Sequence, residues 1–175
     1  MEIIMEALKR VSPEKVGIHS QCIVDFIRQV RAEGIELHSL MILRHGKVCE
    51  EAWWKPYDSG TPQTMFSFSK SITSTAVGFA VQEGLLSLDE KLVDLFPNET
   101  PENPGENVKA ADVYSLLTMS CGQESDIYYK LKSYDHWIHD FMHAEFKYKP
   151  GTMFQYNSTG TDMLCAIIKK KTGLN

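Results

Sequence analysis

A serine and a lysine three positions apart, Ser67 and Lys70, are the residues whose types and spacing most suggest chemistry. They lie in MFSFSKSITSTAVGFA, residues 65–80, where hydroxyl side chains lead into an apolar helical pattern. Side chains three apart share a helix face, with Cβ atoms about 5–6 Å apart. The positive end of the helix dipole favours a developing alkoxide on Ser67. Burial of Lys70 would favour the neutral amine that can act as a base, and its expected apolar neighbours are Phe66, Phe68 and Ile72.

The spacing alone does not identify a catalytic serine, because a second Ser-x-x-Lys occurs at Ser12 and Lys15. That pair lies in a polar turn with no apolar helix behind it, so we set it aside. For Ser67, the alternative is a structural role as the N-cap of the helix that follows. The local pattern leaves nucleophile and cap as competing interpretations.

The elements that would position this pair are helices around one short hairpin. Ser20 is expected to cap a helix to about Ala32, and an antiparallel hairpin is predicted from Leu40–Leu43 and Val48–Trp54. The first strand is apolar at every position, so both of its faces need cover, yet no convincing strand follows Trp54. Further helices are predicted at about 67–84, 111–119, 134–145 and 159–171, and 98–107 is expected to be an exposed loop.

Several longer segments resemble the family of serine β-lactamases and penicillin-binding proteins. As in that family, the Ser67–Lys70 helix is followed by a Gly-x-Leu-x-Leu-Asp pattern, here Gly84, Leu86, Leu88 and Asp89. The segments YSLLTMSCG and PGTMFQYNSTG resemble two later family segments. Tyrosine leads the second motif, so the class C β-lactamases and their esterase and D-aminopeptidase relatives are the most similar branch. Met119 stands where histidine is frequent in the family.

The resemblance implies a role for each matching residue. Ser67 would be the acylated nucleophile, Lys70 its hydrogen-bonded partner, and Tyr156 the group that exchanges a proton with nucleophile and leaving group. Ser158 occupies the place of the motif's asparagine and Asn157 precedes it, so either side chain could contact Lys70 or the substrate.

The family's third motif, a Lys or His near a glycine on a strand, is not found. Lys171-Thr172-Gly173 imitates it, but DMLCAIIKKKTG has helical spacing, and we interpret Gly173 as a helix C-cap.

The resemblance implies an α+β fold of the β-lactamase/transpeptidase type, an antiparallel sheet flanked by helices, with only its N-terminal half present. Residues 1–62 would form a helix and the first hairpin, and residues 63–175 the nucleophile helix and the helical region. The C-terminal strands would be absent, and we expect the 175-residue chain alone to be a poor catalyst.

The function predicted is that of a serine hydrolase acting on a small ester, amide or β-lactam without a cofactor. The alternative is a truncated, non-catalytic binding or regulatory relative. The missing half or a homo-oligomer partner would complete the fold.

Composition and charge narrow the partners. A net charge of −5 with no basic run argues against nucleic acid, and no membrane-length apolar run or signal-peptide pattern is found, so we expect a cytoplasmic protein. His136, His139 and His143 share a helix face, but their apolar neighbours lie opposite, so we interpret that face as solvated and expect no metal site.

Overall fold

The structure, a computed structural model, describes residues 7–131 and 135–174. The chain forms two compact units, Met1–Thr64 and Met65–Asn175, which we describe separately. The division into residues 1–62 and 63–175, as parts of a larger fold, stays a prediction.

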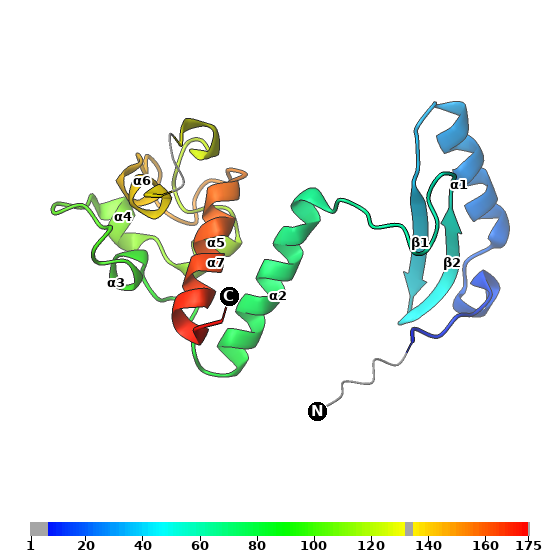
Figure 1. The fold of residues 1–175 in the computed structure, drawn as a ribbon, viewed down its shortest axis with the longest axis horizontal. Coiled ribbons are helices and arrows are strands. Elements are labelled where there is room, and N and C mark those ends of the chain that lie inside the picture. The colour runs from blue at the N-terminus through cyan, green and yellow to red at the C-terminus, as the bar shows by residue number, and fades with distance from the viewer. Residues whose placement is uncertain (1–6, 132–134, 175) are drawn as a thin grey trace. The chain divides into compact units, whose positions relative to one another are not determined.

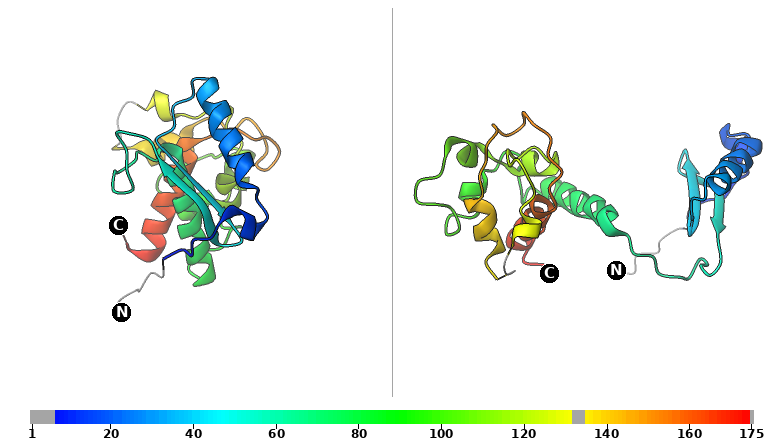
Figure 2. Two further views of the ribbon diagram at one scale, coloured as in Figure 1. Left: turned by 90° about the vertical axis from the view of Figure 1, so that its right-hand side faces the viewer. Right: turned by 90° about the horizontal axis from the view of Figure 1, so that it is seen from above.

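The first unit contains one helix and one hairpin. A 3₁₀ turn at Pro13–Val16 leads into α1, Ser20–Ala32, followed by β1, Ser39–Arg44, and β2, Lys47–Trp53. The two strands pair antiparallel, with Ser39 opposite Trp53 and Arg44 opposite Lys47. The helix lies along the hairpin (Figure 1), as further views show (Figure 2). The predicted helix and hairpin are confirmed.

The hairpin turn follows from its residues. His45 and Gly46 both have positive φ, 51° and 69°, the conformation that a tight turn between twisted strands requires. In the first strand, Met41 and Leu43 each remain 48% exposed. Among the described residues the sheet has these two strands, so one face of the apolar first strand is uncovered within this unit, as the sequence pattern anticipated.

The start of α1 differs from the prediction. His19 is the N-cap and Ser20 is the first helical residue. The Glu14 carboxylate accepts hydrogen bonds from the Ser20 hydroxyl and, at 3.0 Å, from its backbone N–H. The carboxylate thus satisfies the first free N–H of the helix, and the Ser20 hydroxyl donates to Glu14.

The second unit is a helical assembly. Its elements are a 3₁₀ turn at Phe66–Phe68, α2 at Ser69–Gln82, α3 at Leu92–Leu95, α4 at Glu106–Ala110, α5 at Val113–Leu117, a 3₁₀ turn at Tyr128–Lys130, α6 at Trp137–His143 and α7 at Ser158–Thr172. The helices α2 and α7 lie side by side (Figure 1).

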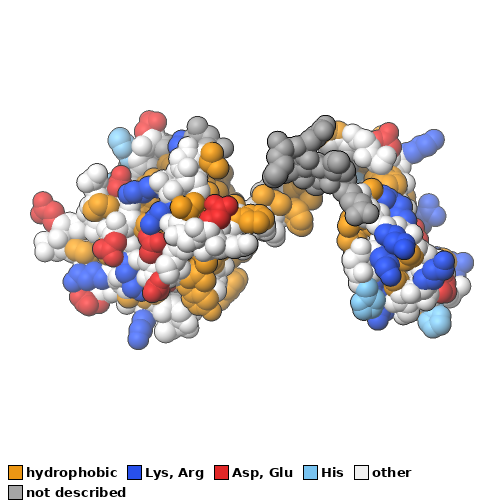
Figure 3. Space-filling model, turned by 90° about the horizontal axis from the view of Figure 1, so that it is seen from below, with side chains coloured by type: hydrophobic (Ala, Val, Ile, Leu, Met, Phe, Trp, Pro, Cys, Tyr) orange, Lys and Arg blue, Asp and Glu red, His pale blue; other side chains and the backbone are white. Residues whose placement is uncertain are grey.

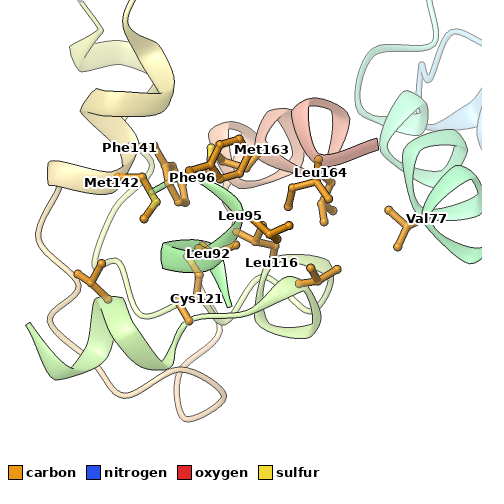
Figure 4. Packing of buried hydrophobic residues seen from close by; sticks show 14 of the residues in the cluster. Val77, Leu92, Leu95, Phe96, Leu116, Cys121, Phe141, Met142, Met163 and Leu164 are labelled. Atoms are coloured by element: carbon orange, nitrogen blue, oxygen red, sulfur yellow. The ribbon is translucent and has the colours of Figure 1, made fainter. Parts of the chain in front are cut away.

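One hydrophobic core holds this unit together. Figure 4 shows Val77 of α2 and Met163 and Leu164 of α7 on the same cluster as Leu92, Phe96 and Phe141. Burial at about 1.5–3 kcal/mol per large apolar side chain outweighs the weak intrinsic stability of the four- and five-residue helices. Two of those short helices, α3 and α4, were not predicted, and α4 begins inside the expected loop 98–107.

The end of α7 agrees with the sequence. Thr172 is the last helical residue, and Gly173 follows with φ 69° and donates its N–H to the Lys169 carbonyl. The interpretation of Lys171-Thr172-Gly173 as a helix end is therefore confirmed.

Candidate active site

Ser67 lies in the 3₁₀ turn immediately before α2. The N-cap of α2 is Phe68, which makes no side-chain capping bond, so capping does not explain the position of Ser67. Phe66 has a positive φ of 43°, which is uncommon for a non-glycine residue and marks local strain next to the serine. The competing interpretation of Ser67 as the helix cap is therefore wrong.

Two side chains converge on the Ser67 hydroxyl. Lys70 Nζ lies 3.4 Å from Ser67 Oγ, and the Tyr156 hydroxyl donates a 2.7 Å hydrogen bond to the same oxygen. Lys70 Nζ also lies 5.2 Å from the centroid of the Tyr156 ring. Lys70 comes from one turn further along α2, whereas Tyr156 comes from 89 positions away.

These contacts change the acidity of the phenol. Hydrogen bonds with Ser67 and then Lys70, together with the lysine charge, lower the pKa of Tyr156 from its ordinary value. A lowered phenol pKa makes the phenolate easier to reach near neutral pH, which suits a residue that accepts and returns a proton.

The surroundings of Lys70 differ from the expectation. Lys70 is half-buried, but Phe66, Phe68 and Ile72 are 81%, 56% and 63% exposed and do not bury it. Ile72 lies two residues further along α2, about 200° around the helix, so its side chain points away from that of Lys70. The expected apolar cover of Lys70 by these three residues is wrong within this unit.

Backbone hydrogen bonds hold the segment that leads to Tyr156. Gly122 O accepts the Tyr148 N–H at 2.9 Å, Ser120 O accepts the Gly151 N–H at 2.9 Å, and Met119 O accepts the Gln155 N–H at 2.8 Å. The stretch 119–122 thus pairs with residues 148–155, the loop that leads to Tyr156 (the tyrosine loop), and holds it in place. These hydrogen bonds give a structural role to LLTMSCG, a segment that stands out in the sequence only by its resemblance to the family.

Asn157 and Ser158 have different surroundings. Asn157 is only 2% exposed; its carbonyl oxygen accepts the Gly160 N–H as the N-cap of α7, and its amide donates to Gln123 Oε1 at 2.8 Å. Ser158 is half-buried, and its backbone N–H donates to Asp126 at 2.6 Å. Asn157 is therefore committed to internal contacts on both sides of its amide.

Sequence reasoning missed two polar partners in the site's support, Gln123 and Asp126. Gln123 is buried and links Asn157 to the Phe141 carbonyl. Asp126 accepts from the backbone at the start of α7. The available signal was a polar cluster, QESD, directly after an apolar segment, but its partners at the start of α7 lie more than thirty positions away, and a local pattern cannot identify them.

His139 and His143 of α6 are solvent-exposed. His139 and His143 stack with centroids 3.7 Å apart, while Phe141 and Met142 are fully buried opposite. Across residues 7–131 and 135–174, no group of three His, Cys, Asp or Glu side chains is arranged to hold a metal ion. Nor does any helix in those ranges have the length and apolar character that crossing a bilayer requires.

Comparisons with known proteins identify the fold. Solved structures with the same fold include a class C β-lactamase, with a TM-score of 0.72 and 20% identity over 94% of this chain and 47% of that one. The octameric penicillin-binding protein homologue from Pyrococcus abyssi has a TM-score of 0.68 and 27% identity, over 90% of this chain and 40% of that one. The fold is therefore the β-lactamase/transpeptidase-like fold, represented in part, with helices and a small antiparallel sheet.

The relatives found by sequence are described differently from these solved structures. A protein of Dichelobacter nodosus described as "Probable fimbrial assembly protein FimD, serogroup H1" is 28% identical, over 85% of this chain and 42% of that protein. The chain thus spans less than half the length of these relatives.

The family match itself is extensive. The sequence model of the family described as Beta-lactamase matches residues 23–175, which include the hairpin, the serine turn and the tyrosine segment. The chain belongs to the β-lactamase family.

Proposed function

We propose that this protein is a serine hydrolase that forms an acyl-enzyme on Ser67 with a small ester, amide or β-lactam. The observation that carries the proposal is the convergence of Lys70 Nζ and the Tyr156 hydroxyl on one serine oxygen. A nucleophile with two proton-handling groups within reach is the arrangement that covalent acyl transfer requires.

The proposed reaction proceeds in two halves. Lys70 accepts the proton of the Tyr156 phenol, and the resulting phenolate accepts the Ser67 proton as Ser67 Oγ attacks the substrate carbonyl carbon. The charge that Lys70 then carries stabilises the negative charge on both oxygens. The tetrahedral intermediate collapses, the bond to the leaving group breaks, and the leaving group takes its proton from Tyr156. Water then attacks the acyl-enzyme, returns a proton to Ser67 Oγ and releases the acid.

Ser158, rather than Asn157, is the better candidate for substrate contact in this proposal. Its position matches the motif's asparagine, and its side chain is half-buried, whereas the Asn157 amide is already bonded on both sides. Substrate identity within the three carbonyl classes is a separate question, since the same triad suits each of them.

A non-catalytic binding role is the second candidate, because the curated relative from Dichelobacter nodosus is described by assembly and not by hydrolysis. The two candidates differ in one property, covalent modification at Ser67.

The deciding experiment treats the protein with p-nitrophenyl acetate and, separately, with a fluorescent penicillin, and locates any added mass by peptide mapping. We expect an adduct on Ser67 that disappears in Ser67→Ala and persists in Ser69→Ala, the matched control two residues along the same segment. An adduct that persists in Ser67→Ala would contradict the assignment of Ser67 as the nucleophile. No adduct from either reagent would favour the binding role.

A further inference from the structure

We propose that Asp126 is a positioning residue for Tyr156, holding the backbone directly after it so that the phenol reaches Ser67. The proposal concerns the site of the proposed function and rests on it. It begins from one carboxylate that contacts two consecutive residues at the start of α7.

The contacts of Asp126 are numerous and specific. Its Oδ2 accepts the Ser158 N–H at 2.6 Å, and its Oδ1 accepts the Thr159 hydroxyl at 2.7 Å and the Thr159 N–H at 3.3 Å. Oδ1 also accepts the Tyr128 N–H at 3.0 Å, which fixes the carboxylate from its own loop. Both oxygens therefore face donors.

Tyr156 depends on such anchors because packing does not hold its ring. The side chain is 44% exposed, yet its hydroxyl lies 2.7 Å from Ser67 Oγ. The preceding residue, Gln155, is tied to the Met119 carbonyl, and the second residue after it, Ser158, is tied to Asp126. The backbone of Tyr156 is thus held on both sides, and Asp126 is the side-chain member of that pair of anchors.

The charge of Asp126 is maintained by the same contacts. Burial would raise the pKa of Asp126, but hydrogen bonds from the Thr159 hydroxyl and from backbone N–H groups of Tyr128, Ser158 and Thr159 hold it below its ordinary value. Asp126 is therefore a carboxylate at neutral pH, a strong acceptor for the N–H groups at the positive end of α7.

Two effects of Asp126 on Tyr156 have opposite signs, which makes the proposal testable. The negative charge raises the pKa of the phenol, whereas hydrogen bonding with Ser67 and Lys70, which the positioning maintains, lowers it more strongly. The other charged group nearby is Asp162 on α7; burial raises its pKa, with Lys70 acting against that rise and Asp126 adding to it.

Asp126→Asn separates these effects. An amide at this position must turn its NH₂ group toward a backbone or hydroxyl donor, because both carboxylate oxygens accept from donors. If Asp126 positions Tyr156, the phenol withdraws from Ser67 and Lys70, and the pKa of Tyr156 rises. If Asp126 acted only through its charge, that pKa would fall. If it only stabilised α7, the phenol would keep its contacts, and that pKa would stay unchanged or fall slightly through loss of the charge.

The measurement is a pH titration of protein labelled with ¹³Cζ-tyrosine, with the Tyr156 resonance assigned by its loss in Tyr156→Phe. Asp94→Asn, an exposed carboxylate in the same unit, is the matched control and should leave the pKa of Tyr156 as in the wild type. The expected result is a rise in Asp126→Asn alone, and a fall or no change would overturn the proposal.

Two further readouts keep the test independent of folding and of catalysis. Thr159→Val removes only the hydroxyl contact to Asp126 and should give a smaller rise, which serves if Asp126→Asn does not fold. If the wild-type protein is acylated at Ser67, we also expect acylation of Asp126→Asn to be about 10- to 100-fold slower, because misplacing a catalytic group by about 1 Å can cost about 100-fold in rate. Absence of acylation in the wild type would contradict the proposed function, whereas the phenol titration would still decide the positioning proposal.

Discussion

Replacing Gly122 by alanine should disrupt the support of the tyrosine loop more than alanine at any other described glycine would. Gly122 has φ 105°, and a Cβ there would lie 2.2 Å from the Tyr148 carbonyl oxygen and 3.3 Å from its carbon. The same two residues share the 2.9 Å backbone hydrogen bond from Tyr148 N to Gly122 O. The methyl group therefore cannot enter unless the two segments separate.

The expected cost has three parts. The positive φ costs about 1–3 kcal/mol for a residue with a Cβ. Forced separation of packed segments costs about 1–3 kcal/mol, and the weakened backbone hydrogen bond about 1 kcal/mol. A loss of about 3 kcal/mol or more is a large share of the roughly 5–15 kcal/mol that stabilises a typical domain.

Two other glycines make matched controls. Gly151 also has a positive φ, 82°, but a Cβ there would have nothing within 4 Å, so Gly151→Ala should cost only the conformational term, about 1–2 kcal/mol. Gly78 lies inside α2 with open space around it, and Gly78→Ala should stabilise the protein by about 1 kcal/mol through helix propensity.

The assay is urea unfolding followed by circular dichroism at 222 nm, with the free energy of unfolding extrapolated to water. We expect the order Gly78→Ala, wild type, Gly151→Ala and Gly122→Ala from most to least stable. A loss in Gly122→Ala no greater than in Gly151→Ala would refute the close approach of Gly122 to Tyr148.

Four further outcomes are expected. Lys70→Arg should lower the rate of Ser67 acylation by at least about 100-fold in stopped-flow assays while preserving the circular dichroism spectrum, because arginine does not give up its proton; near-native rates would contradict a base role. Tyr156→Phe should slow acylation by about 10²–10⁴-fold, and a change of only a few-fold would leave Tyr156 as a packing residue. Asn157→Ala should reduce stability by about 2–4 kcal/mol in urea unfolding, from loss of the α7 cap and of the donor to Gln123 Oε1, and a loss under 1 kcal/mol would argue against that network. Since the pKa of Asp126 is lowered by folding, its contribution to stability is full above about pH 4 and is lost as pH falls through the lowered pKa; acid unfolding of Asp126→Asn should lack this component, and an unchanged acid profile would count against it.

The parts of the fold that the sequence alone determined are those set by short-range interactions. The helix α1, the hairpin turn at Gly46 and the glycine end of α7 at Gly173 each depend on residues close together in the chain. The spacing of Ser67 and Lys70 belongs to the same class, because two side chains three positions apart meet at a helix start wherever the rest of the chain goes.

The sequence was less informative where a local contact had competitors. Ser20 and Ser67 both have the side chain of a helix cap, yet Glu14 serves the first helix, and Ser67 sits in a 3₁₀ turn one residue before the cap of α2. The short helices α3 and α4 carry little intrinsic helix preference over four or five residues and form because the shared core buries their apolar side chains.

Tertiary structure decided the rest of the candidate site. Tyr156 meets Ser67 because the stretch 119–122 carries the tyrosine loop and because Gln123 and Asp126 hold the start of α7 from more than thirty positions away. The choice between Asn157 and Ser158 was likewise open in the sequence, since adjacent residues point in different directions and only the packing of the loop decides which is buried. Contacts of this range leave no periodic trace in a single sequence, because they depend on where two loops are placed by the core between them.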